Sequence, residues 1–154
     1  MNRKSRTAAL SIISNTVLIV LKIITGVLTG SVSIVSEAIH STVDLFASVI
    51  AFVSVRIADT PPDEEHPYGH EKVENISGVV EAILVFAASA MIIYSAVTKL
   101  IHGSKVDSIG LGFIVMFVSA GVNALVARKL YKVAKEEDSV ALEADALHLK
   151  ADVY

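Results

Sequence analysis

Long apolar stretches alternate with short polar segments along most of the chain. They predict helices over about 7–29, 32–57, 75–100 and 109–133, each long enough to cross a bilayer, since a span needs roughly 20 residues. A fifth helical pattern, about 139–154, is still running at the last residue, so we expect the chain to stop inside a fifth helix. The pattern predicts an all-α membrane protein, a bundle of transmembrane helices with four complete spans and the start of a fifth.

The first apolar stretch follows the basic segment MNRKSR and could also be taken for a secretory signal peptide. It is longer than the apolar core of such a peptide, and it carries Asn15 and Lys22. We therefore interpret it as the first spanning helix.

Basic residues are distributed unevenly between the two sides of this predicted bundle. Nine lie on the side of the N-terminus and two on the opposite side, so the positive-inside rule predicts a cytoplasmic N-terminus. The nine are Arg3, Lys4, Arg6, Arg56, Lys72, Arg128, Lys129, Lys132 and Lys135, and the two are Lys99 and Lys105.

Composition narrows the chemistry that the chain can carry. Hydrophobic residues make up 53% of the 154 positions, more than is usual for a soluble domain. The net charge of −3 suggests no nucleic-acid partner. Because there is no cysteine, any metal must be held by histidine, carboxylate or backbone oxygen.

Ionisable residues inside a membrane span are costly and indicate function by default, and two of the predicted spans carry several of them. The second span contains Glu37, His40 and Asp44, whose spacings place them on one helix face. The fifth contains His148 and Asp152, again four residues apart. Both helices therefore carry the pattern His-x-x-x-Asp.

Depth brings these two patterns together. At about 1.5 Å per residue, and with the two helices running in opposite directions relative to the predicted membrane sides, Asp44 lies level with His148 and His40 level with Asp152. Two nitrogens and two oxygens in a tetrahedron suit Zn²⁺. The alternative is that each pair is a helix-packing hydrogen bond, the usual role of a lone pair of this kind; two pairs at matched depth favour the metal site.

The polar loop DEEHPYGHEK holds a second cluster of the same residue types, Asp63, His66 and His70. It could bind another metal near the cytoplasmic surface. It could also be a solvated loop whose acidic residues favour the dipole of the following helix. Spacing alone leaves both interpretations open.

Other charged residues inside the spans lie outside the His-x-x-x-Asp patterns. Lys22 and Glu37 are placed symmetrically about Gly30, so an antiparallel hairpin would bring them to the same depth as an ion pair. The alternative is that Lys22 extends outward to the membrane surface. Glu81, in the third span, has no partner that the spacing identifies.

Three motifs resemble the cation diffusion facilitator family, and the resemblance covers essentially the whole chain. They are SVSIVSEAIHSTVD, DEEHPYGHEKVE and EADALHLKADVY. The resemblance implies a homodimer whose protomers have six spanning helices and a cytoplasmic ferredoxin-like domain. Residues 1–154 are then expected to be a truncated transmembrane cation-efflux domain, without the sixth helix and the cytoplasmic domain.

The resemblance also implies export of zinc or a related divalent ion from the cytoplasm in exchange for protons. It assigns a transport site to His40, Asp44, His148 and Asp152, and a second site to Asp63, His66 and His70. Lys72 matches a loop lysine that supports the dimer by pairing with the cytoplasmic domain. Histidine at position 40 resembles zinc-preferring members; Cd²⁺, Fe²⁺ and Co²⁺ stay open, and a manganese-type site would be all carboxylate.

We therefore expect a Zn²⁺/H⁺ antiporter working by alternating access, not an enzyme, in a prokaryotic inner membrane. Its partners would be divalent ions, protons, lipid and a second copy of the chain. One alternative is a membrane fragment that binds metal or a protein partner without transport. A remote alternative is an intramembrane metalloenzyme, which the absence of an HExxH motif and of a neighbouring general base disfavours.

Overall fold

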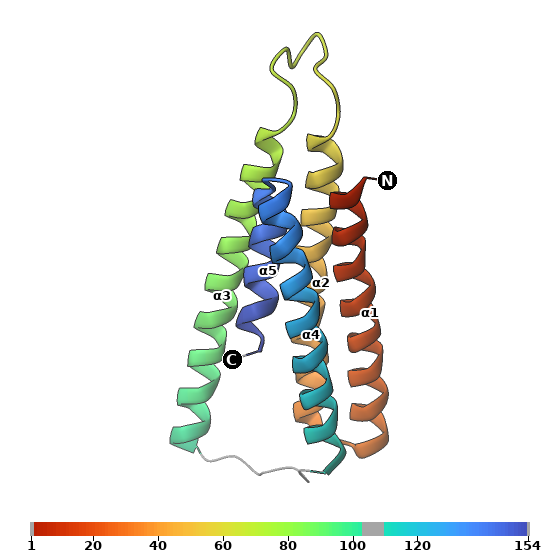
Figure 1. Cartoon of the computed structure of the whole chain (residues 1–154). Helices are drawn as coiled ribbons and strands as arrows, with labels where there is room; N and C mark the ends of the chain where they lie inside the picture. The colour runs from red at the N-terminus through yellow and green to blue at the C-terminus, as the bar shows by residue number, and fades with distance from the viewer. Residues whose placement is uncertain (1, 103–109, 154) are drawn as a thin grey trace.

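The computed structural model describes residues 2–102 and 110–153, and every regular element in these ranges is a helix (Figure 1). This confirms the predicted all-α class. Lys105 and Tyr154, which entered the sequence predictions, lie outside the described residues. The helices are α1 Arg3–Thr29, α2 Val32–Ala58, α3 Lys72–His102, α4 Gly110–Glu136 and α5 Val140–Ala151.

Four of these helices, α1 to α4, are long and apolar enough to cross a membrane. They form an elongated bundle with the shorter α5 lying among α2, α3 and α4 (Figure 1). We call the end that carries the 59–71 loop the loop end, and the end with the turn at Gly30 the hairpin end. The N-terminus and the α4–α5 connection lie toward the loop end, so α3 and α5 both run from the loop end toward the hairpin end (Figure 1).

Most helices extend further than the apolar pattern predicts, because polar residues continue them beyond the apolar segment. The first helix begins at Arg3 rather than 7, where Asn2 Oδ1 accepts a hydrogen bond of 2.9 Å from the Ser5 amide. The third begins at Lys72 rather than 75, and the fourth continues to Glu136 rather than 133. The fifth is shorter than predicted: it ends at Ala151, with Asp152 as its C-cap.

The α1–α2 hairpin depends on two glycines. Gly30 ends α1 with φ +66°, the left-handed conformation that favours glycine at a helix C-terminus. At Gly26, a Cβ atom would lie 2.7 Å from Val35 Cγ2, so only a glycine allows α1 and α2 this close an approach. The hairpin therefore sets the alignment of α1 with α2.

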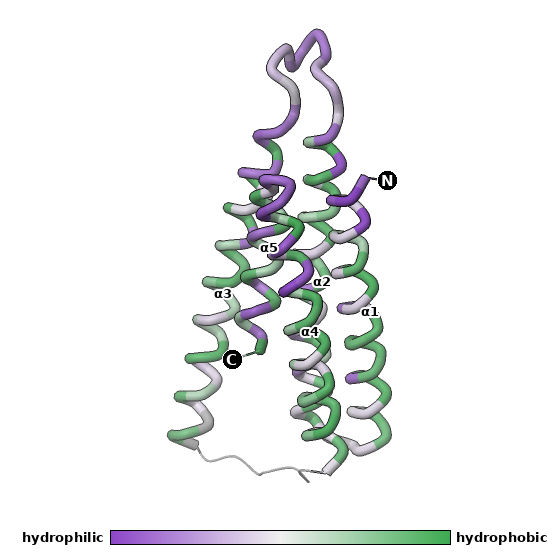
Figure 2. Tube along the Cα trace, viewed as in Figure 1, coloured by the Kyte–Doolittle hydropathy of each residue, from purple (hydrophilic) through white to green (hydrophobic). Residues whose placement is uncertain are grey.

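The buried apolar core joins α1, α2, α4 and α5 and consists largely of alanine, valine and leucine. Leu130, Leu142 and Leu149 are fully buried at its centre. The opposite pattern holds on α3, whose apolar residues beyond its first turns are mostly exposed, as expected of a lipid-facing surface. Figure 2 shows the same division along the bundle: polar residues concentrate toward the loop end, and apolar residues dominate the hairpin half.

Candidate metal centre

The crossing of α2 and α5 brings together two residues that are 104 positions apart. His148 Nε2 lies 3.1 Å from Asp44 Oδ1, and both side chains are buried. His148 Nδ1 is also buried and has no hydrogen-bond partner among the described residues. The depth match that the sequence predicts for Asp44 and His148 is thus present as a direct contact.

His40 and Asp152 complete the group. One ligand atom from each of His40, Asp44 and Asp152 lies within 4.8 Å of the other two. His148 joins this set through its contact with Asp44. The structure therefore gathers all four residues that the sequence predicts, with two imidazoles and two carboxylates as donors; we call them the transport cluster, after the site that the family resemblance implies.

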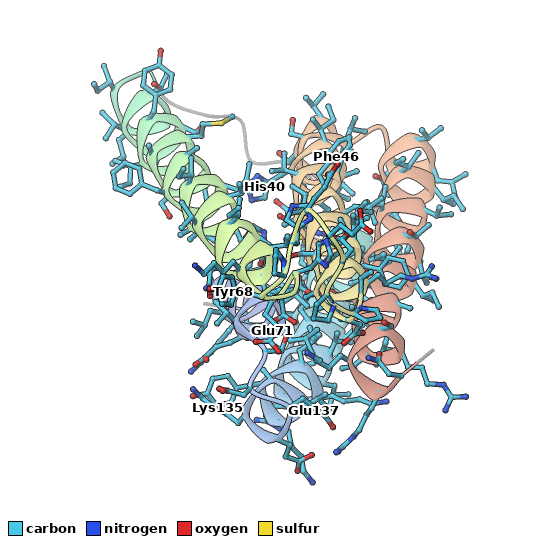
Figure 3. The ribbon with its side chains drawn as sticks, turned by 90° about the horizontal axis from the view of Figure 1, so that it is seen from above. His40, Phe46, Tyr68, Glu71, Lys135 and Glu137 are labelled. Atoms are coloured by element: carbon cyan, nitrogen blue, oxygen red, sulfur yellow. The ribbon has the colours of Figure 1, made fainter. Side chains whose placement is uncertain are left out.

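The transport cluster opens on one side. His40 and Asp152 border a cavity of about 290 Å³, with Glu37 and Ser89 also in its lining. In Figure 3, His40 projects from α2 toward the side of the bundle on which α3 lies. The cluster thus has a buried side, at Asp44, and an accessible side, at Asp152.

Lys22 lies beside the cluster and is itself buried. Its Nζ is 3.0 Å from Glu37 Oε1 and donates a hydrogen bond of 2.7 Å to Ser41 Oγ. Of the two alternatives for Lys22, the structure has the contact with Glu37 that the hairpin symmetry predicts. Sequence reasoning missed Ser41, although its position four residues after Glu37 was a usable signal.

A buried polar network supports α5 behind the cluster. Ser48 Oγ donates to Asp145 Oδ1 at 3.0 Å and accepts from Asn15 Nδ2 at 2.9 Å. Ser11 Oγ lies 2.9 Å from the same Ser48 hydroxyl. Because these residues come from α1, α2 and α5, the network fixes the rotation of α5 that points His148 at Asp44. Sequence reasoning missed all four, although Asp145 lies on the same helix face as His148, three residues earlier.

Glu74 fixes the start of α5 at the loop end. Its carboxylate accepts from Lys4 Nζ at 3.1 Å, from Ser139 Oγ at 2.5 Å and from the Ala141 amide at 3.4 Å. Ser139 is the N-cap of α5, so Glu74 ties this cap to the first turn of α3 and to α1. The sequence offers no signal for this contact beyond an acid near a helix start.

The 59–71 loop folds its three candidate ligands together. Asp63 Oδ1 accepts from the His66 amide at 2.6 Å, and Asp63 Oδ2 lies 3.4 Å from His70 Nε2. One ligand atom from each lies within 4.8 Å of the others. Gly69, with φ +81°, makes the turn that returns the chain toward Asp63. We call these three residues the loop cluster.

Hydrogen bonding sets the charge of the loop cluster. The backbone amide of His66 holds the pKa of Asp63 below its usual 3.8; burial opposes this shift, and the His66 side chain adds to it. Asp63 is therefore anionic over the whole range in which proteins bind metals. His70 Nδ1, buried and without a hydrogen-bond partner in the described part of the chain, offers a further nitrogen. Lys72 begins α3 next to this loop and is exposed.

Comparison with known proteins agrees with this architecture. The family pattern described as the cation efflux transmembrane domain matches residues 8–154. An uncharacterized transporter of Synechocystis sp. is 39% identical over 127 residues, which cover 82% of this chain and 41% of the relative. An uncharacterized transporter of Methanocaldococcus jannaschii is 34% identical over 152 residues, 99% of this chain and 54% of the relative.

A named relative has a described activity. The cation-efflux pump FieF of Klebsiella pneumoniae is 30% identical over 150 residues, 97% of this chain and 50% of the pump. The chain thus spans about half the length of the curated relatives it matches. With its four apolar spans and the matched transmembrane domain, this multi-pass membrane protein belongs to the cation diffusion facilitator family of cation-efflux transporters.

Proposed function

We propose that this chain is the cation-translocating part of a Zn²⁺/H⁺ antiporter that exports zinc from the cytoplasm. The observation that carries the proposal is the convergence of His40, Asp44 and Asp152, with His148 bonded to Asp44, inside an apolar bundle. Ionisable groups are retained at such depth where they handle ions or protons. The loop end is the cytoplasmic side in this proposal, in accord with its excess of basic residues.

The donor set favours zinc among the divalent ions. Two imidazole nitrogens and two carboxylate oxygens match the tetrahedral preference of Zn²⁺. Harder ions such as Mg²⁺ and Mn²⁺ prefer oxygen ligands throughout, whereas Cd²⁺, Fe²⁺ and Co²⁺ accept mixed sets with less selectivity. The two carboxylates of the cluster also compensate the charge of the ion, which matters where the surroundings are apolar.

Proton coupling follows from the contact between Asp44 and His148. A carboxylate can only accept, so the hydrogen bond requires a proton on His148 Nε2. A cation that uses this nitrogen displaces that proton, which moves to Nδ1 when the ring is neutral and leaves the site only when both ring nitrogens are protonated. We therefore propose that the cation exchanges with the imidazolium form of His148. Protons arriving from outside would release zinc by the same exchange, and rocking of the helices would expose the cluster to one side at a time.

The remaining assignments extend this proposal. The loop cluster would hold a second zinc ion at the cytoplasmic surface, and Lys72 would support a homodimer by pairing with a cytoplasmic domain. The chain would lie in a prokaryotic inner membrane with its N-terminus in the cytoplasm. We propose a transporter rather than an enzyme, since the cluster serves as a passage for the ion and no covalent step is needed.

Flux through proteoliposomes tests the proposal. Purified chain is reconstituted around a zinc-sensitive dye, and zinc uptake is followed with and without a pH gradient. We expect gradient-dependent uptake that Asp44→Ala abolishes and His66→Ala reduces less. Uptake that is absent in the parent, or that persists in Asp44→Ala, would contradict the proposed function.

A further inference from the structure

Glu81 of α3 is a buried acid that the transport cluster does not include. Its side chain is 1% exposed. Oε1 accepts a hydrogen bond of 3.1 Å from Ser77, and Oε2 has no hydrogen-bond partner among residues 2–102 and 110–153. Burying a carboxylate without a countercharge is costly, so this position is one that a cation would stabilise.

A cavity between α3 and α5 connects Glu81 with the transport cluster. It has a volume of about 540 Å³, and both Glu81 and His148 line it. Its other walls are largely apolar, with Val79, Val85 and Leu147 among them. Asn75 and Glu143 border it closer to the loop end. This is a different cavity from the one beside His40 and Asp152, and His148 lines both.

The acids in this cavity follow a sequence of depths. Glu74 and Ser139 are hydrogen-bonded, so α3 and α5 are level at that point. With a rise of about 1.5 Å per residue, Glu143 lies about 6 Å, Glu81 about 10 Å and His148 about 14 Å further toward the hairpin end. Glu81 is therefore the last acid before the transport cluster on a path from the loop end.

The two acids in the cavity lining differ in their partners. Glu143 is compensated by Lys135, whose Nζ lies 2.6 Å from its carboxylate. Within the described residues, Glu81 has the Ser77 hydroxyl as its hydrogen-bond donor and no cation beside it. Glu81 is thus the acid of this cavity that is left to act on an incoming ion.

We propose that Glu81 is an inner way station for the transported cation, an oxygen ligand that holds the divalent ion, still partly hydrated, before it passes to His148 and Asp44. The inference rests on the proposed function, which makes the loop end cytoplasmic. A buried carboxyl group without a countercharge keeps its proton until a cation takes the place of that proton, so Glu81 would receive the ion by exchanging a proton for it. One carboxylate with water holds the ion weakly enough to release it to the cluster.

Binding kinetics test this role. The loop cluster is disabled by Asp63→Ala and His66→Ala, and the chain in nanodiscs is mixed with Zn²⁺ while a zinc-sensitive dye reports free zinc. Glu81→Gln keeps the size of the side chain and removes its carboxyl group. Glu64→Gln, in the exposed loop, removes the same group outside the cavity and is the matched control.

We expect Glu81→Gln to slow association about tenfold, the lower end of the range by which acidic groups on an access path raise the association rate of a cation. Dissociation should slow by the same factor, so that the Kd of the transport cluster stays within about twofold of the control value. Glu81→Asp, which keeps the carboxyl group, should keep most of the fast association. If the glutamine variant does not fold, Glu81→Ala, which also removes the carboxylate, is the test variant.

Three outcomes would overturn the inference while leaving the proposed function intact. Association in Glu81→Gln as fast as in Glu64→Gln would show that the carboxyl group has no part in ion access. A weaker Kd at an unchanged association rate would make Glu81 a ligand or support of the cluster instead. Slow association shared by Glu81→Asp would point to packing, as when a lipid or a further helix fills the cavity. Absence of any Asp44-dependent zinc binding in the parent would instead reject the proposed function, and this inference with it.

Discussion

The transport cluster and the loop cluster use the same residue types in opposite settings. Asp63, His66 and His70 lie within eight residues of one another, and Asp63 and His66 are exposed. The transport cluster joins two helices across 104 positions, with the Asp44–His148 contact buried. Local chain geometry therefore forms the loop cluster, and helix packing forms the transport cluster.

This difference decides how each site responds to change. In the loop, the His66 amide and the turn at Gly69 position the ligands without help from the bundle. In the bundle, the Ser48–Asp145 hydrogen bond and the hydrogen bond from Ser139 to Glu74 position α5, and with it His148. A substitution in the bundle should thus affect ion binding and folding together, whereas one in the loop should affect binding alone.

The largest effect is expected for Asp44→Ala. Losing this carboxylate removes a ligand and leaves His148 buried without its partner, so zinc affinity at the transport cluster should fall by more than about 100-fold, beyond the range for loss of an outer-sphere partner. Isothermal titration in detergent, with the loop cluster disabled, measures this. The control is Glu64→Ala, which removes an exposed acid. Equal affinities in the two variants would remove Asp44 from the site.

His66→Ala tests the loop cluster in the same way that Asp44→Ala tests the transport cluster. It should abolish binding at the loop cluster while leaving the Kd of the transport cluster within about twofold. Because the side chain is exposed, the free energy of unfolding should change by less than about 0.5 kcal/mol. Titration and chemical denaturation of the same variant measure both quantities. A shift in both sites at once would show that the two clusters are coupled.

Lys22→Met tests whether the surroundings of the transport cluster matter to folding. The substitution keeps most of the side-chain volume but leaves Glu37 and Ser41 without their donor, so the protein should lose about 2 kcal/mol of stability, the scale for a hydrogen bond to a charged group. Thermal denaturation against Lys129→Met, an exposed lysine of α4, measures the difference. A stability equal to that of the wild-type chain would mean that the contact with Glu37 contributes nothing.

The smallest expected effect is the loss of the Asp63–His66 turn at low pH. The pKa of Asp63 is lowered, so the Asp63–His66 turn should be fully formed above pH 3.8 and lost as the pH falls through the lower folded-state value. Carboxyl chemical shifts of Asp63 should therefore titrate with a midpoint below 3.8 in the metal-free chain. Asp63→Asn should abolish this pH dependence. A midpoint above 3.8 would contradict the hydrogen-bonded turn.

Much of this fold could be predicted from the sequence because membrane spans have a strong pattern. The four apolar stretches match α1 to α4, and their ends differ by the polar residues that extend each helix. The transport cluster could be anticipated from the spacing of His40, Asp44, His148 and Asp152, since charged groups inside spans are conspicuous. The pairing of Lys22 with Glu37 followed from the symmetry of a tight hairpin.

The supporting contacts could not be predicted, for a physical reason. Ser11, Asn15 and Ser48 are small polar residues that fit any helix, and their partners depend on how α1, α2 and α5 are rotated about their axes. The same holds for Glu74, whose hydrogen bond to Ser139 requires α3 and α5 to begin side by side. Glu81 was visible in the sequence as an acid inside the third span, but its cavity exists only after α3 and α5 have packed.

X-ray absorption of bound zinc tests the central claim most directly. With the loop cluster disabled, the zinc edge should report nitrogen and oxygen neighbours at about 2.0–2.1 Å, including two imidazoles. His148→Ala should reduce the imidazoles to one, and His40→Ala likewise. Spectra that keep two imidazoles after either substitution would mean that α2 and α5 do not meet around one ion.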